Sequence, residues 1–382
     1  MRDVAITGIG LVSSLGEGRD AHWQAMRAGE PNVDALTLAP YPFHPLAEPD
    51  WTTQISRRDK RQMEPWQQIG TYAAGLALDD AGLKETEATA TMDMIVAAGG
   101  GERDIEVDGA ILEEAPATDD RSAYEGTPRE TFVAERLAND LRPTLFLAQL
   151  SNLLAGNISI VHKVTGSSRT YMGEEGAGIA AVANAVARVG AGQSECMLVG
   201  GSFAAAREDM MLVFELGQYL AREWQPVWAR DDGLILGSVG AFLVLEPREA
   251  AEARGATVHA VIECASGDHG GESGRARRFA ATLSDADAIL SGASGVRRPT
   301  RMERDVLAER SAPLRAYGSL TGHGVEAHFP LGVALAAICL QNGGLPAPVG
   351  DDEAAADVVP ESILVTGVGH WRGEGAALVR KA

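Results

Sequence analysis

Residues 176–202 read GAGIAAVANAVARVGAGQSECMLVGGS, a helical pattern that leads through a glycine-containing turn into an apolar segment. Ile179, Val182 and Val186 recur at the i, i+3, i+7 spacing of one helix face, which predicts a helix over 175–190. The segment CMLVGGS at 196–202 is short and apolar and closes on glycines, which predicts a buried strand. A helix that leads directly into a buried strand is typical of an α/β fold.

The same two signals alternate along the whole chain. Short apolar segments predict strands at 4–12, 94–100, 196–202, 234–246, 258–267, 288–294 and 363–369. Helical patterns lie between them, at 61–82, 143–155, 175–190, 302–310 and 328–342. Strands that alternate with helices predict a layered α/β architecture.

Two parts of the chain end in the same order of features. CMLVGGS is followed by GAFLVLE (240–246), and the segment ILVTGVGHWRGEGAALV (363–379) likewise contains a strand, glycines and a second apolar strand. With the helical pattern EPREAAEARG (246–255) as a connector, this repeat predicts two related halves, 1–248 and 257–382. The segment 101–128 is rich in Asp, Glu and Thr and lacks periodicity. We expect an exposed insertion or lid there, with a plain solvated loop as the alternative.

Composition excludes several classes of function. The chain has 382 residues, with 33 Lys and Arg against 53 Asp and Glu, and a net charge of −20. No basic cluster offsets this excess, which argues against nucleic-acid binding and against adhesion to an anionic membrane. Three cysteines cannot form a disulfide framework, no apolar run reaches the ~18 residues of a membrane span, and the N-terminus lacks a signal pattern. We therefore expect a cytoplasmic protein without membrane insertion.

Several segments together carry a resemblance to a known family. They are VAITGIGLVSSLGEG (4–18), AGNISIVHKVTGSS (155–168), residues 176–202, RDDGLILGSVGAFLVLE (230–246) and GSLTGHG (318–324). In order and spacing they resemble β-ketoacyl-acyl-carrier-protein synthases of the thiolase superfamily. The resemblance implies a thiolase fold, with two βαβαβ halves in a five-layer αβαβα sandwich. It also implies a Cys nucleophile at a helix N-terminus, which favours the thiolate, and two His residues that assist malonyl decarboxylation and stabilise the oxyanion.

The nucleophile position holds a carboxylate in this chain. Family spacing, counted back from the strand at 196–202, places the nucleophile at Glu175, and a shift of one residue gives Glu174 or Gly176, never a thiol. Glu175 as a nucleophile would form a mixed anhydride, which is less stable to water than a thioester. The alternatives are a carboxylate favoured by the helix dipole, or a fixed negative charge that keeps the pocket closed. The three cysteines stand elsewhere and read as small buried hydrophobes: Cys196, Cys264 and Cys339.

The other positions implied by the resemblance are mostly altered too. Ser291 stands at the first His position, and a hydroxyl cannot replace an imidazole in proton transfer near neutral pH. His323 keeps the second His position, where a purely structural His is the alternative, and Gly318 stands at the Lys position. Val368 and Gly369 fall in the segment that gates the acyl pocket in the family, with Val368 in place of the gating Phe.

These replacements favour a catalytically degenerate member that resembles a chain-length factor. We expect a subunit of fatty-acid or polyketide biosynthesis that pairs with an active ketosynthase through the strand at 167–172, with acyl carrier protein as a further partner. The missing first His argues against a decarboxylase. The alternatives are an active 3-oxoacyl-carrier-protein synthase with non-standard residues, or a free-standing acyl-binding homodimer. We expect no metal and no cofactor. Carrier docking would need a local basic patch, for which the candidates are Arg297, Arg298, Arg301 and Arg304; a solvated helix face is the alternative.

Overall fold

The computed structural model describes residues 2–101, 103–115, 128–142, 145 and 149–382. Within these residues the strands form one eleven-stranded sheet, in the order β4-β3-β5-β6-β1-β7-β11-β10-β8-β9, with the short β2 (Gly16–Glu17) paired to β1. One end of this order contains β1 (Val4–Ser13), β3 (Asp93–Ala97), β4 (Ser168–Tyr171), β5 (Met197–Phe203) and β6 (Val239–Pro247). The other end contains β7 (Ala260–Asp268), β8 (Ala288–Ser291), β9 (Leu314–Ala316), β10 (Ser362–Val368) and β11 (Glu374–Arg380).

The two ends of the sheet repeat one strand order. The five strands of each set can be numbered one to five in chain order. From the outer edge of the sheet inward, the strands of both sets then follow the order three, two, four, five, one. A short antiparallel pairing of Val4–Ile6 with Ala260–Ile262 joins the two sets. Two related halves would give this arrangement, and the boundaries 1–248 and 257–382 stay a prediction.

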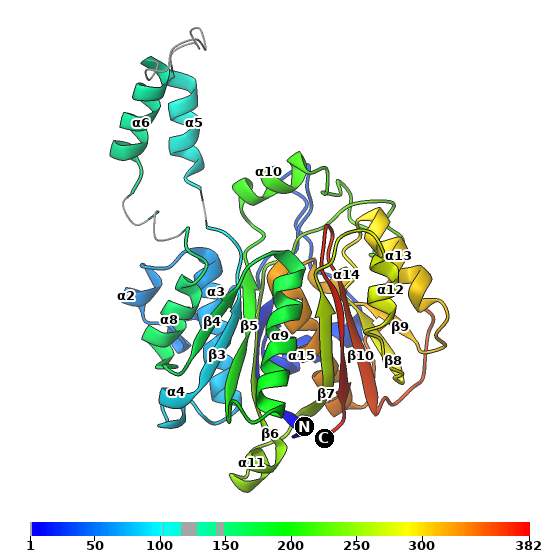
Figure 1. Cartoon of the computed structure of the whole chain (residues 1–382). Coiled ribbons are helices and arrows are strands. Elements are labelled where there is room, and N and C mark those ends of the chain that lie inside the picture. Colours follow the sequence, from blue (N-terminus) through cyan, green and yellow to red (C-terminus); the bar gives the residue numbers. More distant parts are fainter. Residues whose placement is uncertain (1, 102, 116–127, 143–144, 146–148) are drawn as a thin grey trace.

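Helices cover both faces and also fill the centre. α3 (Pro65–Asp80) and α8 (Leu153–His162) lie against one outer face, and α12 (Arg275–Ala280) and α13 (Arg297–Leu307) lie against the other (Figure 1). α9 (Glu174–Gly190) and α15 (His328–Asn342) pack between the two sets of strands. The result is the αβαβα layering that the sequence predicts.

The central helices are built for burial. In α15 every residue from His328 to Leu340 is buried, as expected of a helix that is apolar on all sides. α9 buries the predicted stripe of Ile179, Val182 and Val186.

The predicted strands are all present, with shifted ends. The strand predicted at 234–246 begins only at Val239, because Leu234 and Leu236 make single bridging pairs with other segments. The prediction missed β9, which is three residues long. The helix predicted at 143–155 falls partly outside the described residues, and α8 begins at Leu153.

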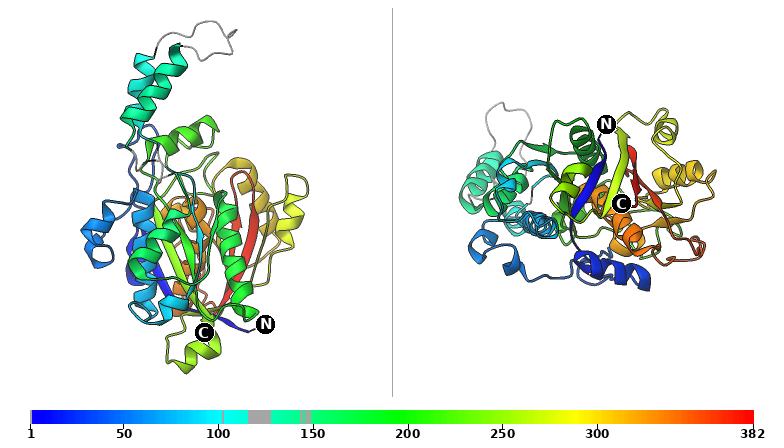
Figure 2. Two further views of the ribbon diagram at one scale, coloured as in Figure 1. Left: turned by 60° about the vertical axis from the view of Figure 1, so that its left-hand side comes forward. Right: turned by 90° about the horizontal axis from the view of Figure 1, so that it is seen from below.

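Two helices, here called the arm, stand off the body: α5 (Ile105–Glu114) and α6 (Pro128–Asp140) (Figures 1 and 2). The alternative of a plain solvated loop over 101–128 is wrong for residues 105–114, which are helical, whereas 116–127 lie outside the described residues. α5 begins where the Asp104 side chain accepts a hydrogen bond from the Val107 amide, and Ile111 is its one buried residue. Because α5 packs mainly on α6, its apolar stripe is too narrow to be recognised in the sequence. Its role as an insertion or lid stays a prediction.

The remaining helices are short or peripheral. They are α1 (Gly18–Ala28), α2 (Arg57–Lys60), α4 (Ala88–Thr91), α10 (Glu208–Leu216), α11 (Arg248–Ala253) and α14 (Gly318–Thr321), with 3-10 turns η1 (Trp51–Thr53) and η2 (Val325–Ala327). Across the described residues, no helix combines the length and the apolar character needed to cross a membrane.

Candidate functional site

Glu175 lies at the start of the central helix α9, just after the edge strand β4. Its side chain is buried, with 2 % of the residue exposed. The chain enters the helix through Gly173 at φ 120° and Glu174 at φ 51°, and a non-glycine residue rarely takes such a value. This turn places the Glu175 carboxylate inside the molecule, at the end of the helix where the dipole favours a negative charge.

Two imidazoles from the C-terminal part of the chain bind this carboxylate. His323 donates from Nε2 to Glu175 Oε1 at 2.6 Å. His370 donates from its backbone N–H to Oε1 at 3.1 Å, and from Nδ1 to Oε1 and Oε2 at 2.9 and 3.1 Å. Glu175, His323 and His370 thus form a buried cluster, here called the central triad, that joins α9 to two distant segments.

Burial and mutual attraction have opposite effects on the pKa values of Glu175 and His370. Burial opposes ionisation of Glu175, but the charge of His370 and the hydrogen bonds from both imidazoles hold its pKa well below the usual range. Burial likewise opposes the charge on His370, yet Glu175 raises the pKa of His370 above its usual value. Both shifts favour the charged forms of Glu175 and His370, which is the pattern of an ion pair with a second imidazole attached.

A third imidazole packs against the triad at a tilt of 50°. The rings of His323 and His328 lie 4.2 Å apart between centroids, and His328 Nδ1 accepts a hydrogen bond from the Gly324 amide at 3.2 Å. Burial lowers the pKa of His328 far below its usual value, so this ring is neutral. A Cβ placed on Gly292 or Gly318 would lie 3.4 or 3.5 Å from the ring, so His328 lies beside the position assigned to the family Lys.

Ser291 belongs to a different polar cluster. Its hydroxyl donates to Glu303 Oε1 at 2.7 Å and accepts from the Ala293 amide, while Thr366 donates to the same Glu303 oxygen at 2.6 Å. Burial raises the pKa of Glu303 to about 7, against the effect of these two hydroxyls. Among the described hydrogen bonds, none joins Ser291 to Glu175 or His323, so the structure does not bring this predicted site residue into the triad.

The predicted gate segment contributes a residue other than Val368. The Val368 side chain packs with Phe279, Ile289 and Leu364 in the apolar layer under α12 and α13. Gly369 faces the triad, since a Cβ there would lie 3.0 Å from Glu175 Oε2. His370 is the side chain of this segment that binds Glu175, and Phe214 and Tyr219 pack edge-on against its ring.

The sequence analysis missed the roles of His370, His328 and Glu303. His370 follows the predicted gate, and His328 stands where the family usually has small residues after the second His. Both positions therefore differ from the family pattern, but the sequence does not show which groups these side chains contact. The partner of His370 lies 195 residues away in the chain.

None of the three cysteines can act as the missing nucleophile. Burial raises the pKa of Cys196 and of Cys339 to about 12, which disfavours the thiolate. Cys264 is exposed on β7, so the expectation that it is a small buried hydrophobe is wrong, and none of the three stands at the start of α9. Within the described residues, no group of three or more His, Cys, Asp or Glu is placed to hold a metal ion.

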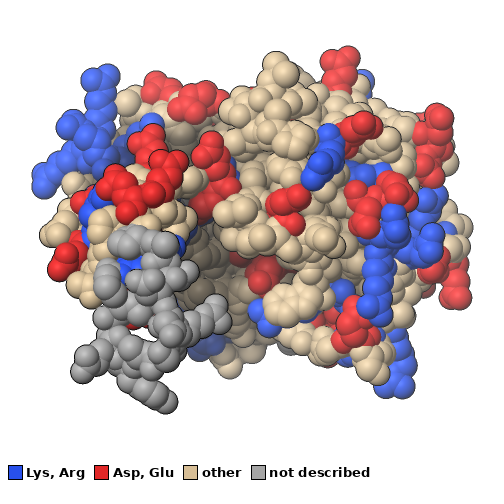
Figure 3. Space-filling model, turned by 90° about the horizontal axis from the view of Figure 1, so that it is seen from above, with Lys and Arg blue, Asp and Glu red and all other residues tan. Residues whose placement is uncertain are grey.

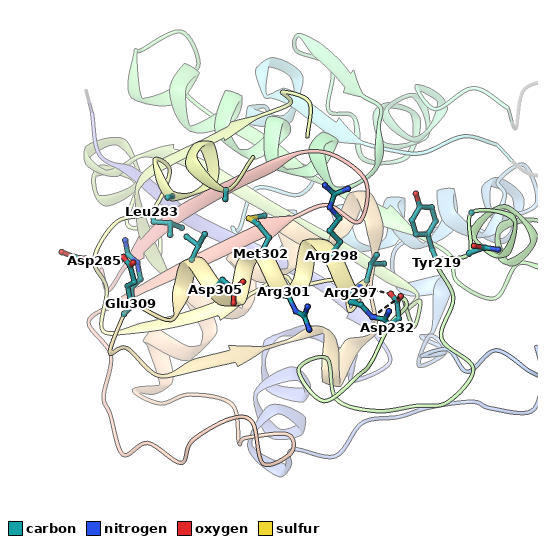
Figure 4. A pocket seen from close by; sticks show the side chains of 17 residues that line it. Tyr219, Asp232, Leu283, Asp285, Arg297, Arg298, Arg301, Met302, Asp305 and Glu309 are labelled. Carbon is teal, nitrogen blue, oxygen red and sulfur yellow. Dashed lines mark hydrogen bonds and ion pairs between the residues drawn. The ribbon is translucent and has the colours of Figure 1, made fainter. Parts of the chain in front are cut away.

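A surface groove of about 1140 Å³ runs along α13, outside the triad (Figure 4). Tyr219 and Asp232 lie at one end of the view, and Leu283, Asp285 and Glu309 lie at the other. Tyr219, which lines the groove, also contacts the site, since its ring centroid is 4.7 Å from that of His370.

The candidate docking arginines near this groove are largely paired. Arg297 binds Asp231 at 2.7 Å, Arg298 binds Glu272 at 2.6 Å and Arg304 binds Asp352 at 2.7 Å; the fourth candidate is Arg301. Seen from above, basic and acidic side chains are intermixed on the side of the molecule that carries α12 and α13 (Figure 3). This surface fits a solvated helix face better than a basic patch for an acidic partner.

Comparison with known proteins adds family evidence to this geometry. The family described as "Beta-ketoacyl synthase, N-terminal domain" matches residues 1–251. The 3-oxoacyl-[acyl-carrier-protein] synthase 2 of Vibrio harveyi is 27% identical over 68% of the chain and 61% of its own length. The chain thus spans about three fifths of the length of such relatives. A tetracenomycin polyketide synthase ketoacyl synthase beta subunit of Streptomyces glaucescens is 26% identical over 94% of the chain and 91% of its own length.

Solved structures show the same fold. The ishigamide ketosynthase/chain length factor matches with a TM-score of 0.80 over 100% of this chain and 99% of its own, at 20% identity. A beta-ketoacyl synthase from Burkholderia phymatum matches with a TM-score of 0.78 over the full length of both chains, at 21% identity. The architecture is therefore the thiolase fold of ketosynthases, as predicted.

Proposed function

Because the chain belongs to the β-ketoacyl synthase family, we propose that it is a non-condensing subunit that pairs with an active ketosynthase in fatty-acid or polyketide biosynthesis. The observation that carries this proposal is the central triad. At the start of α9, where the family resemblance places a Cys, the chain has a buried carboxylate bound by two imidazoles.

The positions that correspond to the family's catalytic residues are unsuited to condensation in three ways. Attack by Glu175 on a thioester would break its contacts with both imidazoles and give an anhydride in place of a thioester. His323 is already engaged by Glu175 and so is not available to an enolate oxygen. Ser291, at the first His position, is fixed by Glu303 and cannot supply a second catalytic imidazole.

Two of the comparisons support a role in shaping the product of a partner. One relative along nearly the whole chain is named a ketoacyl synthase beta subunit, and one structural neighbour contains a chain length factor. We infer that this chain likewise supports an active synthase and helps set the length of its acyl product. Because three of the four candidate docking arginines are paired with acids, the carrier protein would bind chiefly to the partner.

The edge of the sheet offers a surface for this pairing. β4 is the outermost strand of its set and is half exposed, so one row of its backbone groups is free to pair. Two copies that each carry −20 would repel one another, which favours a less acidic partner over a second copy.

Thr170→Pro tests this edge. The Ser167 carbonyl accepts from Met94 of β3 and the Tyr171 carbonyl from Ala98, which follows β3, so in this parallel ladder the amide of Thr170 points to the free edge. Proline there removes an outward donor and leaves the ladder to β3 intact. We expect the wild type to co-elute in size-exclusion chromatography with a co-expressed synthase from its gene neighbourhood, and the variant to elute alone with an unchanged unfolding midpoint.

Two outcomes would contradict the pairing model. A Thr170→Pro chain that still co-elutes with the synthase would remove β4 from the interface. A wild-type chain that forms only a homodimer in the presence of the synthase would contradict the heterodimer itself.

A further inference from the structure

Glu326 is a buried carboxyl that the central triad does not use. It lies in η2, between His323 and α15, and the residue is 6 % exposed. Among the described residues, Oε2 of Glu326 has no hydrogen-bond partner. Its backbone is fixed, because a Cβ on Gly178 of α9 would lie 2.3 Å from the Glu326 carbonyl oxygen, so helix and turn are in close contact.

The side chain of Glu326 reaches the segment that leads from β3 to the arm. A Cβ on Gly99 would lie 2.7 Å from Glu326 Oε1, so only glycine allows this contact. Gly99 is half-buried, whereas Gly100 is exposed and has open space beside it. The segment that contains Gly99 and Gly100 therefore lies between the carboxyl of Glu326 and solvent.

The same part of the chain also forms hydrogen bonds with the start of α10. Arg207 donates from Nη2 to the Gly101 carbonyl at 2.7 Å, and the Arg103 amide donates to Asp209 at 3.2 Å. The root of the arm, Gly99–Gly101, thus contacts both Arg207 at the start of α10 and the carboxyl of Glu326, whose Oε2 has no partner among the described residues.

The charges that face Glu326 disfavour its ionisation. Together they raise the pKa of Glu326 to about 7: burial is the largest influence and raises it, a hydrogen bond from its own backbone lowers it, Glu175 and Glu174 of α9 raise it, and His370 lowers it. On the neighbouring strand β5, the nearest residue is Gly201, which brings no charge. An ionised Glu326 in this position would be a second buried carboxylate beside Glu175, without a cation or a donor for Oε2.

We propose that Glu326 is a proton-dependent latch for the arm: protonated, it packs dry against Gly99, and ionised, it displaces Gly99–Gly101 to reach water. The displacement would weaken the hydrogen bond from the Arg103 amide to Asp209, because Arg103 lies only two residues beyond Gly101 in the chain. The latch is a property of the isolated chain and holds whether or not the chain pairs with a synthase.

Hydrogen exchange of the wild-type chain at several pH values tests the latch. With a pKa of about 7 when closed and the ordinary ~4.3 when the carboxyl is solvated, the opening equilibrium should rise about tenfold from pH 6 to pH 8.5. The readout is the protection of peptides that contain the Arg103 amide, corrected for the pH dependence of intrinsic exchange. A corrected protection that stays constant across this range overturns the proposal.

Two variants assign the effect to Glu326. Glu326→Gln cannot ionise, so the pH dependence of protection near Arg103 should disappear. Glu113→Gln removes an exposed carboxyl from α5 itself and should keep the wild-type dependence. Retained dependence in Glu326→Gln, or loss of it in Glu113→Gln, would overturn the proposal. If Glu326→Gln does not fold, the wild-type profile alone still decides it.

Discussion

Glu175→Ala should lower the free energy of unfolding by about 3–5 kcal/mol near pH 6, the cost expected when one partner of a buried ion pair is removed. The substitution leaves two imidazoles, on residues that are 2 % and 8 % exposed, without the carboxylate that binds them. It also disconnects α9 from the segments that carry His323 and His370. Chemical denaturation, followed by circular dichroism, measures the difference.

The pH of this measurement follows from the two shifted groups. Glu175 has a lowered pKa, so its stabilising effect is present above the usual carboxyl range and is lost as the pH falls through its folded-state pKa. His370 has a raised pKa, so its effect is present below about 6.5 and is lost as the pH rises through its folded-state pKa. Both groups contribute fully between about pH 5 and 6.5, where the variant should differ most from the wild type.

Glu174→Ala is the matched control. Glu174 is the preceding carboxylate on the same helix, but its side chain is 29 % exposed and binds Arg372, which is 48 % exposed. Such a surface pair contributes about 0–1 kcal/mol. If Glu175→Ala costs no more than Glu174→Ala at pH 6, the triad is not the structural link described here.

Glu303→Gln should make the chain more stable than the wild type at high pH. Glu303 has a pKa of about 7, so its stabilising effect is complete below the usual carboxyl pKa and is lost as the pH rises through 7. Glutamine keeps an oxygen for the hydroxyls of Ser291 and Thr366 but cannot ionise. From pH 5 to pH 8.5 the difference in unfolding free energy should shift by about 2–4 kcal/mol in favour of the variant.

The control for this pH series is Glu309→Gln. Glu309 is exposed and lies two residues beyond the end of α13, so its substitution should leave the pH profile of stability unchanged. Parallel profiles for Glu303→Gln and the wild type would mean that Glu303 ionises without cost. The Ser291 cluster would then not be the dry polar core that the structure indicates.

The layered fold could be predicted because its signals are local. Buried strands such as 4–12 and 196–202 carry their own apolar runs, and the stripe of Ile179, Val182 and Val186 marks the face that α9 buries. α5 could not be predicted in this way, since it packs mainly on α6 and leaves a narrow stripe. Helical structure that depends on one neighbouring helix leaves a weak pattern in the sequence.

Of the candidate site, only the position of Glu175 in the fold could be predicted from the sequence. Family spacing places Glu175 at the start of a helix, and the structure has it there. Its partners lie 148 and 195 residues further along the chain, and no local pattern connects a carboxylate to imidazoles over such distances.

The face of the sheet on which the Val368 side chain lies could, by contrast, have been predicted from the sequence. Alternation along β10 puts Val368 on the same face as Leu364, toward the outer helices. The expectation that Val368 takes the place of the gating Phe rests on its position in the family pattern and does not take this alternation into account. For Gly369, which faces Glu175, the gate role stays a prediction.

The most direct test of the non-condensing role is carbon dioxide release from malonyl-carrier protein in the presence of acyl-carrier protein. The purified chain alone should release none above the background without protein. When the same chain is added to its partner synthase, the partner should carry out the condensation. The presence of the chain should change the distribution of acyl chain lengths among the products. Carbon dioxide release or a condensed product from the chain alone would contradict the account, because it would require Glu175 and His323 to do the work of a Cys and two imidazoles.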